Sequence, residues 1–287
     1  MIIHGDAVKG LKKIDAESVD CLIIDPPYNI GKDFGNNKRK QEIAEYVDWS
    51  MLWYHEAKRV LKPSGTMFIY GFSEVLAHLS VNMDMDHRWL AWHYTNKTIP
   101  SLNFWQRSHE TILCAWKDKD QRIFNRDDVR EPYTKGFING YKGKNRTRPN
   151  SGGRFGSKDT TTYKVNEKGA LPRDVLKFSA LAGGAGRRER FGYSPSLGRL
   201  LTSKQIKQMG VSDAISHPTQ KPIALTERLL SSCLPKENQR VVIPFSGTGS
   251  ECYVCEQRGY NWTSFELNDN YVKMGNLLVK DGFPKND

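Results

Sequence analysis

A carboxylate, two prolines and an aromatic ring follow one another directly after an apolar run near the amino terminus. The run reads VDCLII and ends in Asp25, Pro26, Pro27 and Tyr28. Proline has no N–H to donate, so the carbonyl oxygens around it stay available as acceptors, and Asp25 adds a carboxylate beside them. Two acceptors and the flat face of Tyr28 suit a planar group that carries an NH₂, such as the exocyclic amine of a nucleobase flipped out of a duplex. The alternative is a plain turn after a strand, with Tyr28 as a structural residue.

A glycine-containing turn late in the chain has the pattern of a cofactor site. The sequence RVVIPFSGTGSE places Gly247 and Gly249 between an apolar run and a helical pattern that begins at Ser250. Glycines there let the backbone approach a ligand, and a helix amino terminus can receive an anionic group. Glu266 lies seventeen residues after Gly249 at the end of the next strand, where a carboxylate can accept hydrogen bonds from two ribose hydroxyls. The pattern predicts a cofactor that contains a nucleoside, and the lack of a GxxxxGK[ST] motif argues against ATP. The alternative is a tight turn with a surface acid.

Strand and helix patterns alternate around both sets of residues, which predicts a doubly wound, parallel α/β sheet. In such a sheet, ligands bind beyond the carboxyl ends of the strands, where both sets lie. The expected strands are residues 19–25, 66–72, 88–95, 110–116, 240–245 and 261–266. The expected helices are residues 42–62, 73–83, 223–234, 250–259 and 268–279.

The positive charge of the chain is concentrated in its middle. The chain of 287 residues has a formal net charge of +11. Residues 117–207 contain twenty-two Lys and Arg against nine Asp and Glu, so the rest of the chain is slightly acidic. The same stretch loses the α/β rhythm and is rich in Gly and Pro with aromatic residues between them. Such a block favours binding to nucleic-acid phosphates, and the alternative is a solvated surface.

The cysteines and the hydropathy pattern exclude other classes of protein. Five scattered cysteines suit reduced thiols better than a disulfide framework, and CYVC at residues 252–255 has no second ligand pair for zinc. We therefore expect no metal site. No apolar run approaches the roughly 20 residues that span a bilayer, and no leader-like segment begins the chain, so an intracellular protein without a membrane partner is expected.

These motifs together resemble a known family, the S-adenosylmethionine-dependent DNA amino-methyltransferases. DPPY at residues 25–28 is similar to their catalytic motif, PFSGTGS to their cofactor loop and FELNDNYV to their ribose-binding segment. HPTQKP at residues 217–222 resembles the motif that leads into the helix over the methionine end, and GDAVKGL the segment that bears an acid near the adenine. The order, with the catalytic motif first and the cofactor loop last, is that of the permuted β-class.

The resemblance implies a seven-stranded, Rossmann-like methyltransferase sheet with an inserted basic region. Its parts would be a catalytic half at residues 1–116, a target-recognition insertion at 117–212 and a cofactor-binding half at 213–287. Asp25, Pro26, Pro27 and Tyr28 would be catalytic. S-adenosylmethionine would be held by Asp6, Asp25, Thr219, Lys221, Phe245, Gly247, Gly249, Ser250 and Glu266. One position departs from the family pattern, because Ile243 stands where an acid is usual, two residues before Phe245. Either the affinity for the cofactor would then be weaker, or Asp25 and Lys221 would receive the methionine ammonium and carboxylate.

The implied reaction is direct transfer of a methyl group to the N6 amine of adenine in duplex DNA, because an Asp at the head of the motif points to adenine. N4-cytosine methylation is the alternative. Carbon-5 methylation would need a Cys nucleophile in a Pro-Cys pair, which the sequence lacks. Two further hypotheses are methylation of protein glutamine or RNA by the same fold, and a non-catalytic DNA-binding protein.

The basic region would read and hold DNA, since Arg can pair with guanine edges and with phosphates. The candidate DNA-binding residues are Arg146, Arg148, Arg154, Arg187, Arg188 and Arg190. Residues 33–41 form another polar loop that could close over DNA. The resemblance also raises two partner hypotheses, a homodimer and a cognate restriction endonuclease.

Overall fold

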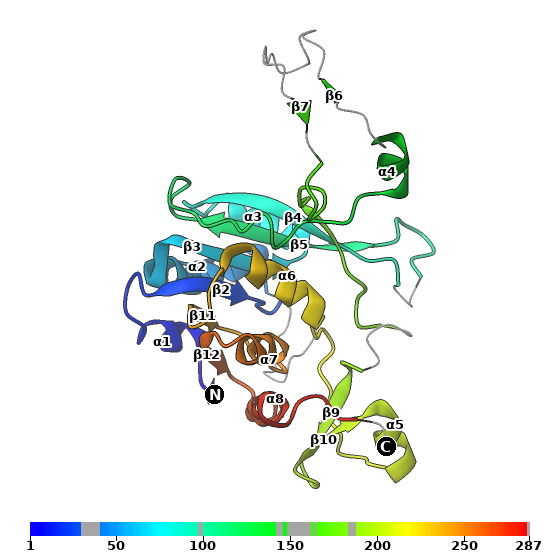
Figure 1. Ribbon diagram of the computed structural model, residues 1–287. Helices are drawn as coiled ribbons and strands as arrows, with labels where there is room; N and C mark the ends of the chain where they lie inside the picture. The colour runs from blue at the N-terminus through cyan, green and yellow to red at the C-terminus, as the bar shows by residue number, and fades with distance from the viewer. Residues whose placement is uncertain are drawn as a thin grey trace. The chain divides into compact units, whose positions relative to one another are not determined.

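An eight-stranded sheet with helices on both faces is the framework of the protein (Figure 1). The computed structural model describes residues 1–29, 41–96, 100–141, 146–147, 162–163, 165–182 and 188–285. The chain divides into two compact units. Residues 1–124 and 174–287 form the first unit, which contains the sheet, and residues 125–173 form the second.

The strand order in the sheet is β1-β12-β11-β2-β3-β5-β4-β8. All neighbours pair in parallel except β5, which is antiparallel to both β3 and β4 because β4 and β5 are joined without a crossover helix. The strands are β1 (Ile2–His4), β2 (Val19–Ile24), β3 (Leu61–Gly71), β4 (Asp86–His93), β5 (His109–Trp116), β8 (Val175–Lys177), β11 (Arg240–Ile243) and β12 (Asn261–Glu266).

The predicted α/β sheet is confirmed, but it has eight strands and not the expected seven. The additional edge strand is β8, which pairs with residues 91–93 of β4. Its three residues, Val-Leu-Lys, are too few to show a strand periodicity.

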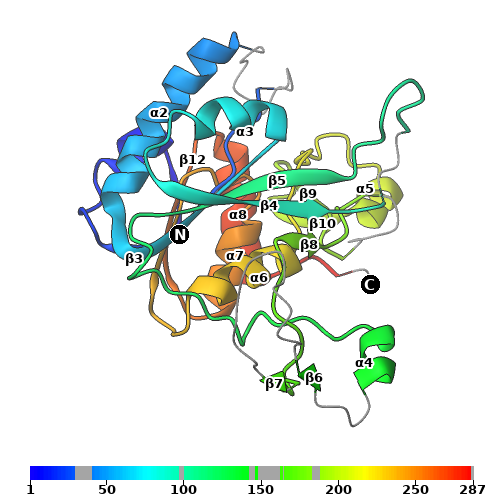
Figure 2. The same cartoon turned by 90° about the horizontal axis from the view of Figure 1, so that it is seen from above.

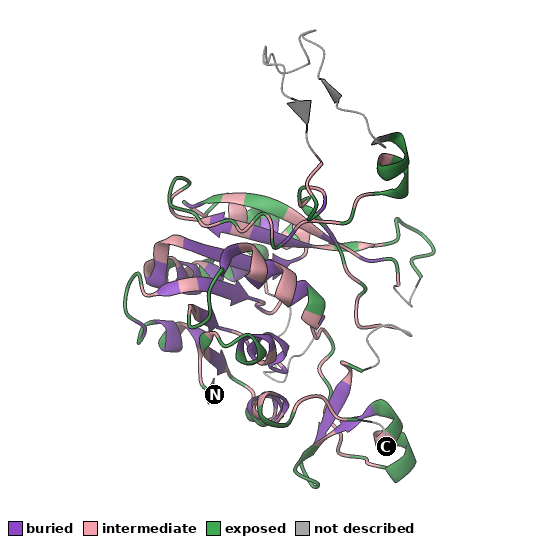
Figure 3. Cartoon of the chain, viewed as in Figure 1, coloured by how far each residue is buried: buried purple, intermediate pink, exposed green. Residues whose placement is uncertain are grey.

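Successive residues of β2 point to opposite faces of the sheet, and both faces are covered by helices (Figure 2). Cys21 and Ile23 pack in a cluster with residues of α6 and α7, whereas Leu22 and Ile24 pack with residues of α1, α2 and α3. The central strands β2 and β3 are accordingly almost entirely buried (Figure 3). The helices are α1 (Ala7–Leu11), α2 (Ile43–Val60), α3 (Ser73–Ser80), α6 (Ile223–Cys233), α7 (Ser250–Gln257) and α8 (Asp269–Asp281). In the described part of the chain, no helix combines the length and the apolar character that a membrane span requires.

A small hairpin and a helix pack beside α8 in the first unit. The hairpin consists of β9 (Phe191–Ser194) and β10 (Arg199–Thr202), and α5 (Ser203–Met209) follows directly. Phe191 and Tyr193 form a buried cluster with residues of α8. Thr202 and Gln205 form a capping box at the start of α5, each side chain accepting a bond from the other's backbone N–H.

The second unit contains α4 (Lys135–Tyr141) and a short pair of strands, β6 (Arg146–Thr147) and β7 (Thr162–Tyr163). Arg130 stabilises this unit from within, because its guanidinium donates to the carbonyl of Gly169 at 2.8 Å and to Asp127 at 2.7 Å. Some of the basic charge in the middle of the chain is thus structural. The recognition role expected for residues 117–212 stays a prediction.

Candidate active site

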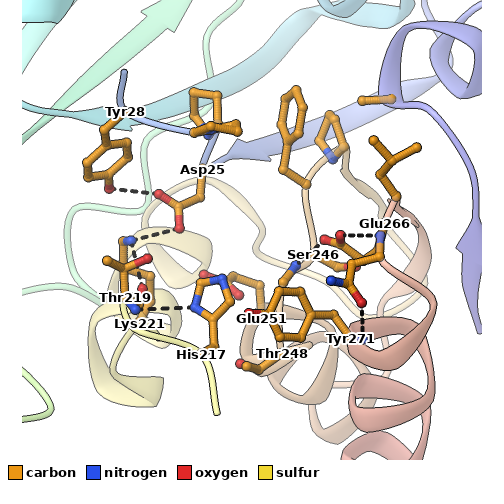
Figure 4. A pocket seen from close by; sticks show the side chains of 18 of the residues that line it. Asp25, Tyr28, His217, Thr219, Lys221, Ser246, Thr248, Glu251, Glu266 and Tyr271 are labelled. Atoms are coloured by element: carbon orange, nitrogen blue, oxygen red, sulfur yellow. Dashed lines mark hydrogen bonds and ion pairs between the residues drawn. The ribbon is translucent and has the colours of Figure 1, made fainter. Parts of the chain in front are cut away.

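The two sets of residues that could do chemistry lie at the ends of neighbouring strands. β12, β11 and β2 are adjacent and parallel, so the segments that follow them meet at one edge of the sheet. There they line a single cavity of about 300 Å³, together with residues of α2 and of the segment before α6 (Figure 4). The Asp-Pro-Pro-Tyr corner and the glycine turn are therefore connected by one cavity, the arrangement required for transfer between two ligands.

Most of the predicted site residues line this cavity. They are Asp6, Asp25, Pro26, Pro27, Tyr28, Thr219, Lys221, Phe245, Gly247 and Glu266. Gly249 and Ser250 do not line it, because Gly249 begins α7 behind the turn and Ser250 is 1% exposed. Their binding roles stay predictions.

Asp25 accepts hydrogen bonds at both carboxylate oxygens. Lys221 donates from Nζ to Oδ2 at 2.7 Å, and the hydroxyl of Tyr28 donates to Oδ1 at 2.7 Å. Lys221 also donates to the carbonyl of Thr219 at 3.2 Å and is only 3% exposed. Burial alone would lower the pKa of Lys221, but the charges of Asp25 and Glu110 outweigh it and raise the pKa above its usual value. The result is a fixed ion pair at the end of β2.

Tyr28 is more enclosed than the sequence suggests. It is 4% exposed, and its ring meets Phe72 edge to face at a centroid distance of 5.2 Å. Its hydroxyl also reaches Glu110 at 3.3 Å. Burial and the charges of Asp25 and Glu110 raise the pKa of Tyr28 well above its usual value, so the phenol stays a neutral donor. In this structure Tyr28 orients Asp25, and the stacking of its ring on a base stays a prediction.

The two proline carbonyls differ in their partners. Tyr46 of α2 donates from its hydroxyl to the carbonyl of Pro27 at 2.8 Å. Among the described residues, no donor is bonded to the carbonyl of Pro26. The expected pair of acceptors for an amine, the Asp25 carboxylate and the Pro26 carbonyl, is thus present at one corner.

Glu266 is held in position by the glycine turn. The N–H of Gly247 donates to Oε2 at 2.9 Å, and the N–H of Asn268 donates to Oε1 at 2.8 Å. Gly247 has a φ of 49°, a left-handed conformation that glycine adopts without strain. Each carboxylate oxygen keeps a lone pair, so Glu266 can accept hydrogen bonds from ribose hydroxyls.

The remaining predicted residues shape the two ends of the cavity. Asp6 caps α1 by accepting from the N–H of Lys9 at 3.0 Å. The ring of Phe245 packs against Trp49 and Trp53 of α2, at centroid distances of 5.9 and 6.1 Å.

Two ionisable residues of the cavity, His217 and Glu251, were not predicted, and they are half-buried and buried respectively. His217 opens the HPTQKP segment, and burial lowers its pKa to about 4, so its imidazole is neutral. Glu251 lies in the first turn of α7, and burial together with the charge of Asp25 raises its pKa to about 7. The sequence offered one signal for Glu251, which is an acid two residues after the glycine turn.

The candidate DNA-binding arginines do not line the cavity. Arg188 is exposed and Arg190 is half-buried. Arg146 lies in β6, and nothing is described of its side chain. Arg148, Arg154 and Arg187 lie outside the described residues, as does most of the polar loop expected at 33–41.

The fold and the site are those of an α/β enzyme. Its glycine turn and Glu266 suit a nucleoside, and Asp25 with the Pro26 carbonyl, in the same cavity, suits an amine. The family model of the N6/N4 DNA methylases, described as DNA methylase, matches residues 19–277. The chain therefore belongs to the DNA methylase family, and the predicted family and class of enzyme are confirmed.

Two curated relatives cover nearly the whole chain. The Type II methyltransferase M.HpaI of Haemophilus parainfluenzae is 27% identical over 287 residues, which are 98% of this chain and 74% of the relative. The DNA adenine methyltransferase YhdJ of Escherichia coli (strain K12) is 27% identical over 279 residues, 96% of this chain and 80% of the relative.

Two solved structures share the fold. The PvuII DNA methyltransferase, described as cytosine-N4-specific, gives a TM-score of 0.63 at 17% identity and covers 96% of this chain and 84% of that chain. The M1.HpyAVI structure, a complex with S-adenosylmethionine, gives a TM-score of 0.54 at 17% identity and covers 96% of each chain.

Proposed function

We propose that this DNA methylase transfers a methyl group from S-adenosylmethionine to the N6 amine of adenine in a base flipped out of duplex DNA. The observation that carries the proposal is the cavity that connects the Asp25–Tyr28 corner with the glycine turn and Glu266. An acceptor for an amine and a site for a nucleoside would lie in one cavity.

The residues of the cavity fit S-adenosylmethionine. Glu266 has free lone pairs beside a turn whose glycine lets backbone come close, which suits the ribose. Asp6 and Phe245 lie among the residues that would surround the adenine, and Thr219 and Lys221 lie beside Asp25 toward the methionine end. When bound, S-adenosylmethionine supplies a methyl carbon that is electrophilic because it is attached to a sulfonium.

Asp25 and the carbonyl of Pro26 hold the target amine by accepting its two hydrogens. Both oxygens of Asp25 already accept one bond each, but a carboxylate oxygen can accept a second. Accepting both N–H bonds turns the nitrogen lone pair away from the ring and toward the methyl donor. The carboxylate of Asp25 would stabilise the positive charge that the amine nitrogen gains on methylation, until that nitrogen loses a proton.

Lys221 and Tyr28 keep Asp25 in one orientation throughout. Their bonds to separate oxygens fix the plane of the carboxylate, so little reorganisation is needed when the amine arrives. His217 stays neutral nearby and brings no competing positive charge.

The choice of adenine rests on Asp25 at the head of the motif and on the name of the relative YhdJ. N4-cytosine methylation is the second candidate, because the PvuII methyltransferase of similar fold is described as cytosine-N4-specific. Residues 117–212 would select the target sequence through their Arg and Lys side chains. A cognate endonuclease is proposed from the Type II description of M.HpaI, and a homodimer stays a family-level hypothesis.

Single-molecule sequencing of DNA from cells that express the protein tests the proposal. N6-methyladenine at a defined sequence is the expected result, and N4-methylcytosine would favour the second candidate. Asp25→Ala should abolish transfer while DNA affinity changes less than about twofold, because phosphate contacts dominate that affinity. Parallel loss of transfer and DNA binding in a folded variant would mean that the corner is structural.

A further inference from the structure

Glu251 is a buried carboxylate of the cavity for which the proposed reaction has no role so far. It lies in the first turn of α7 and is 5% exposed. Its Oε1 atom is buried and has no hydrogen-bond partner among the described residues. A buried carboxylate oxygen without a partner is costly, so its presence in a ligand cavity indicates that a ligand donor satisfies it.

Lys221 is the cation whose charge acts on Glu251, but its hydrogen bonds go to other residues. Lys221 donates to Asp25 and to the carbonyl of Thr219, and no hydrogen bond joins it to Glu251 in the described structure. The positive charge of Lys221 acts on Glu251 only at a distance and lowers its pKa less than burial and Asp25 raise it. Asp25 is thus paired with a lysine, whereas no lysine in the described structure is hydrogen-bonded to Glu251.

We propose that Glu251 binds the primary ammonium group at the methionine end of S-adenosylmethionine. This inference rests on the proposed function. S-adenosylmethionine has two cationic groups, and only the ammonium has N–H bonds to donate to the unpartnered oxygen, since a sulfonium has none. Of the two cationic groups, the ammonium is therefore the one that can donate to Glu251.

The position of Glu251 in the cavity agrees with this assignment. Glu266 marks the ribose, and Asp25 with Lys221 marks the place of transfer on the other side (Figure 4). The charges of both Asp25 and Lys221 act on Glu251, which agrees with a place toward the methionine end.

Glu251 also accounts for the departure at Ile243. Ile243 ends β11, is 1% exposed and cannot pair with a cation. The next acid along the chain is Glu251, and it faces the same cavity from α7. The carboxylate expected at the strand end is supplied here from the following helix.

Calorimetry of the full chain with three ligands tests the role of Glu251. S-adenosylmethionine has both cations, S-adenosylhomocysteine has the ammonium alone, and 5′-methylthioadenosine has neither. For Glu251→Gln at pH 8, we expect the first two ligands to bind about 10- to 100-fold more weakly, as for loss of a charged hydrogen bond. Binding of 5′-methylthioadenosine should change less than twofold. Glu256→Gln, an exposed change on the same helix, is the matched control and should leave all three affinities unchanged.

The other outcomes overturn the inference in distinct ways. Weakening of S-adenosylmethionine alone would assign Glu251 to the sulfonium, equal weakening of all three ligands would make it structural, and no weakening would remove it from binding. If the unaltered protein bound none of the three ligands, the proposed function itself would fail.

A second measurement needs no variant. The other ionisable groups around Glu251 are Asp25, Lys221, His217, Tyr70, Cys252 and Cys255. Of these, His217 is neutral, and burial raises the pKa of Tyr70, Cys252 and Cys255, so none of these four titrates near pH 7. Binding of an ammonium should therefore expel the proton of Glu251, and S-adenosylhomocysteine should release about half a proton at pH 7 in calorimetry across buffers of different ionisation enthalpy. Equal proton release with 5′-methylthioadenosine would contradict the assignment.

Discussion

Replacing Glu251 by Gln should make the cofactor-free protein more stable at neutral and alkaline pH, although it weakens cofactor binding. The pKa of Glu251 is raised from its usual 4.5 to about 7, so the folded state holds this proton more tightly than the unfolded state does. A raised pKa stabilises the fold fully below about pH 4.5, and this contribution is lost as the pH rises toward 7. Above pH 7 the buried negative charge destabilises the fold by about 3 kcal/mol.

The amide of Glu251→Gln does not ionise, so the free energy of unfolding of the variant does not fall as the pH rises through 7. A buried amide that is incompletely hydrogen-bonded costs about 1 kcal/mol at every pH. The variant should then be slightly less stable than the unaltered protein near pH 4.5 and about 2 kcal/mol more stable at pH 8. The change in this difference between pH 5 and pH 8 is about 2.5 kcal/mol and does not depend on the cost of the amide.

Urea unfolding followed by tryptophan fluorescence at several pH values between 5 and 8 measures the effect. Groups that titrate equally in both proteins cancel in the difference, and the exposed change Glu256→Gln is the control. Saturating S-adenosylmethionine should favour the unaltered protein again, because only its carboxylate binds the ammonium. A difference between the two proteins that stays constant within about 0.5 kcal/mol over this range would refute the reasoning.

Three further experiments test the remaining parts of the site. Lys221→Met should lower the free energy of unfolding by about 3 kcal/mol, the lower end of the range for breaking a buried pair, because the side chain of Asp25 keeps 16% exposure. Adding Asp25→Asn should recover most of that loss in urea unfolding at pH 7, and strictly additive losses would contradict a direct pair. Gly249→Ala should cost about 2 to 4 kcal/mol in the same assay, since φ is 79° and the added Cβ would lie 2.8 Å from the Cα of Gly275. Glu266→Gln should weaken S-adenosylmethionine about tenfold in calorimetry and leave DNA affinity unchanged, and an unchanged cofactor affinity would exclude the ribose contact.

The sequence predicted the site best where chemistry is local to a strand end. Asp25 and Glu266 each directly follow or end an apolar strand, so their position at the carboxyl edge of the sheet follows from the parallel topology alone. The bond between Asp25 and Lys221 joins residues 196 positions apart. The HPTQKP resemblance placed Lys221 at the cofactor site but did not predict this bond.

Burial was the property that sequence patterns could not supply. Tyr28 was expected to offer a flat face, but Phe72 and Glu110 enclose it, and neither is near in sequence. Glu251 appears in the sequence as an ordinary acid at a helix amino terminus, which is a common place for a solvated carboxylate. Its unpartnered oxygen depends on how α7 packs against the sheet.

The position of β11 and β12 between β1 and β2 affects how the enzyme matures on the ribosome. Lys221 leaves the ribosome 196 residues after Asp25, which at about 5 to 20 residues per second is about 10 to 40 s later. During that interval β11 and β12, which lie between β1 and β2 in the finished sheet, have not been synthesised. The side of the cavity that contains the glycine turn and Glu266 is therefore still missing. A polypeptide released early by stalled translation therefore lacks the glycine turn and Glu266, even though it carries the complete Asp-Pro-Pro-Tyr corner.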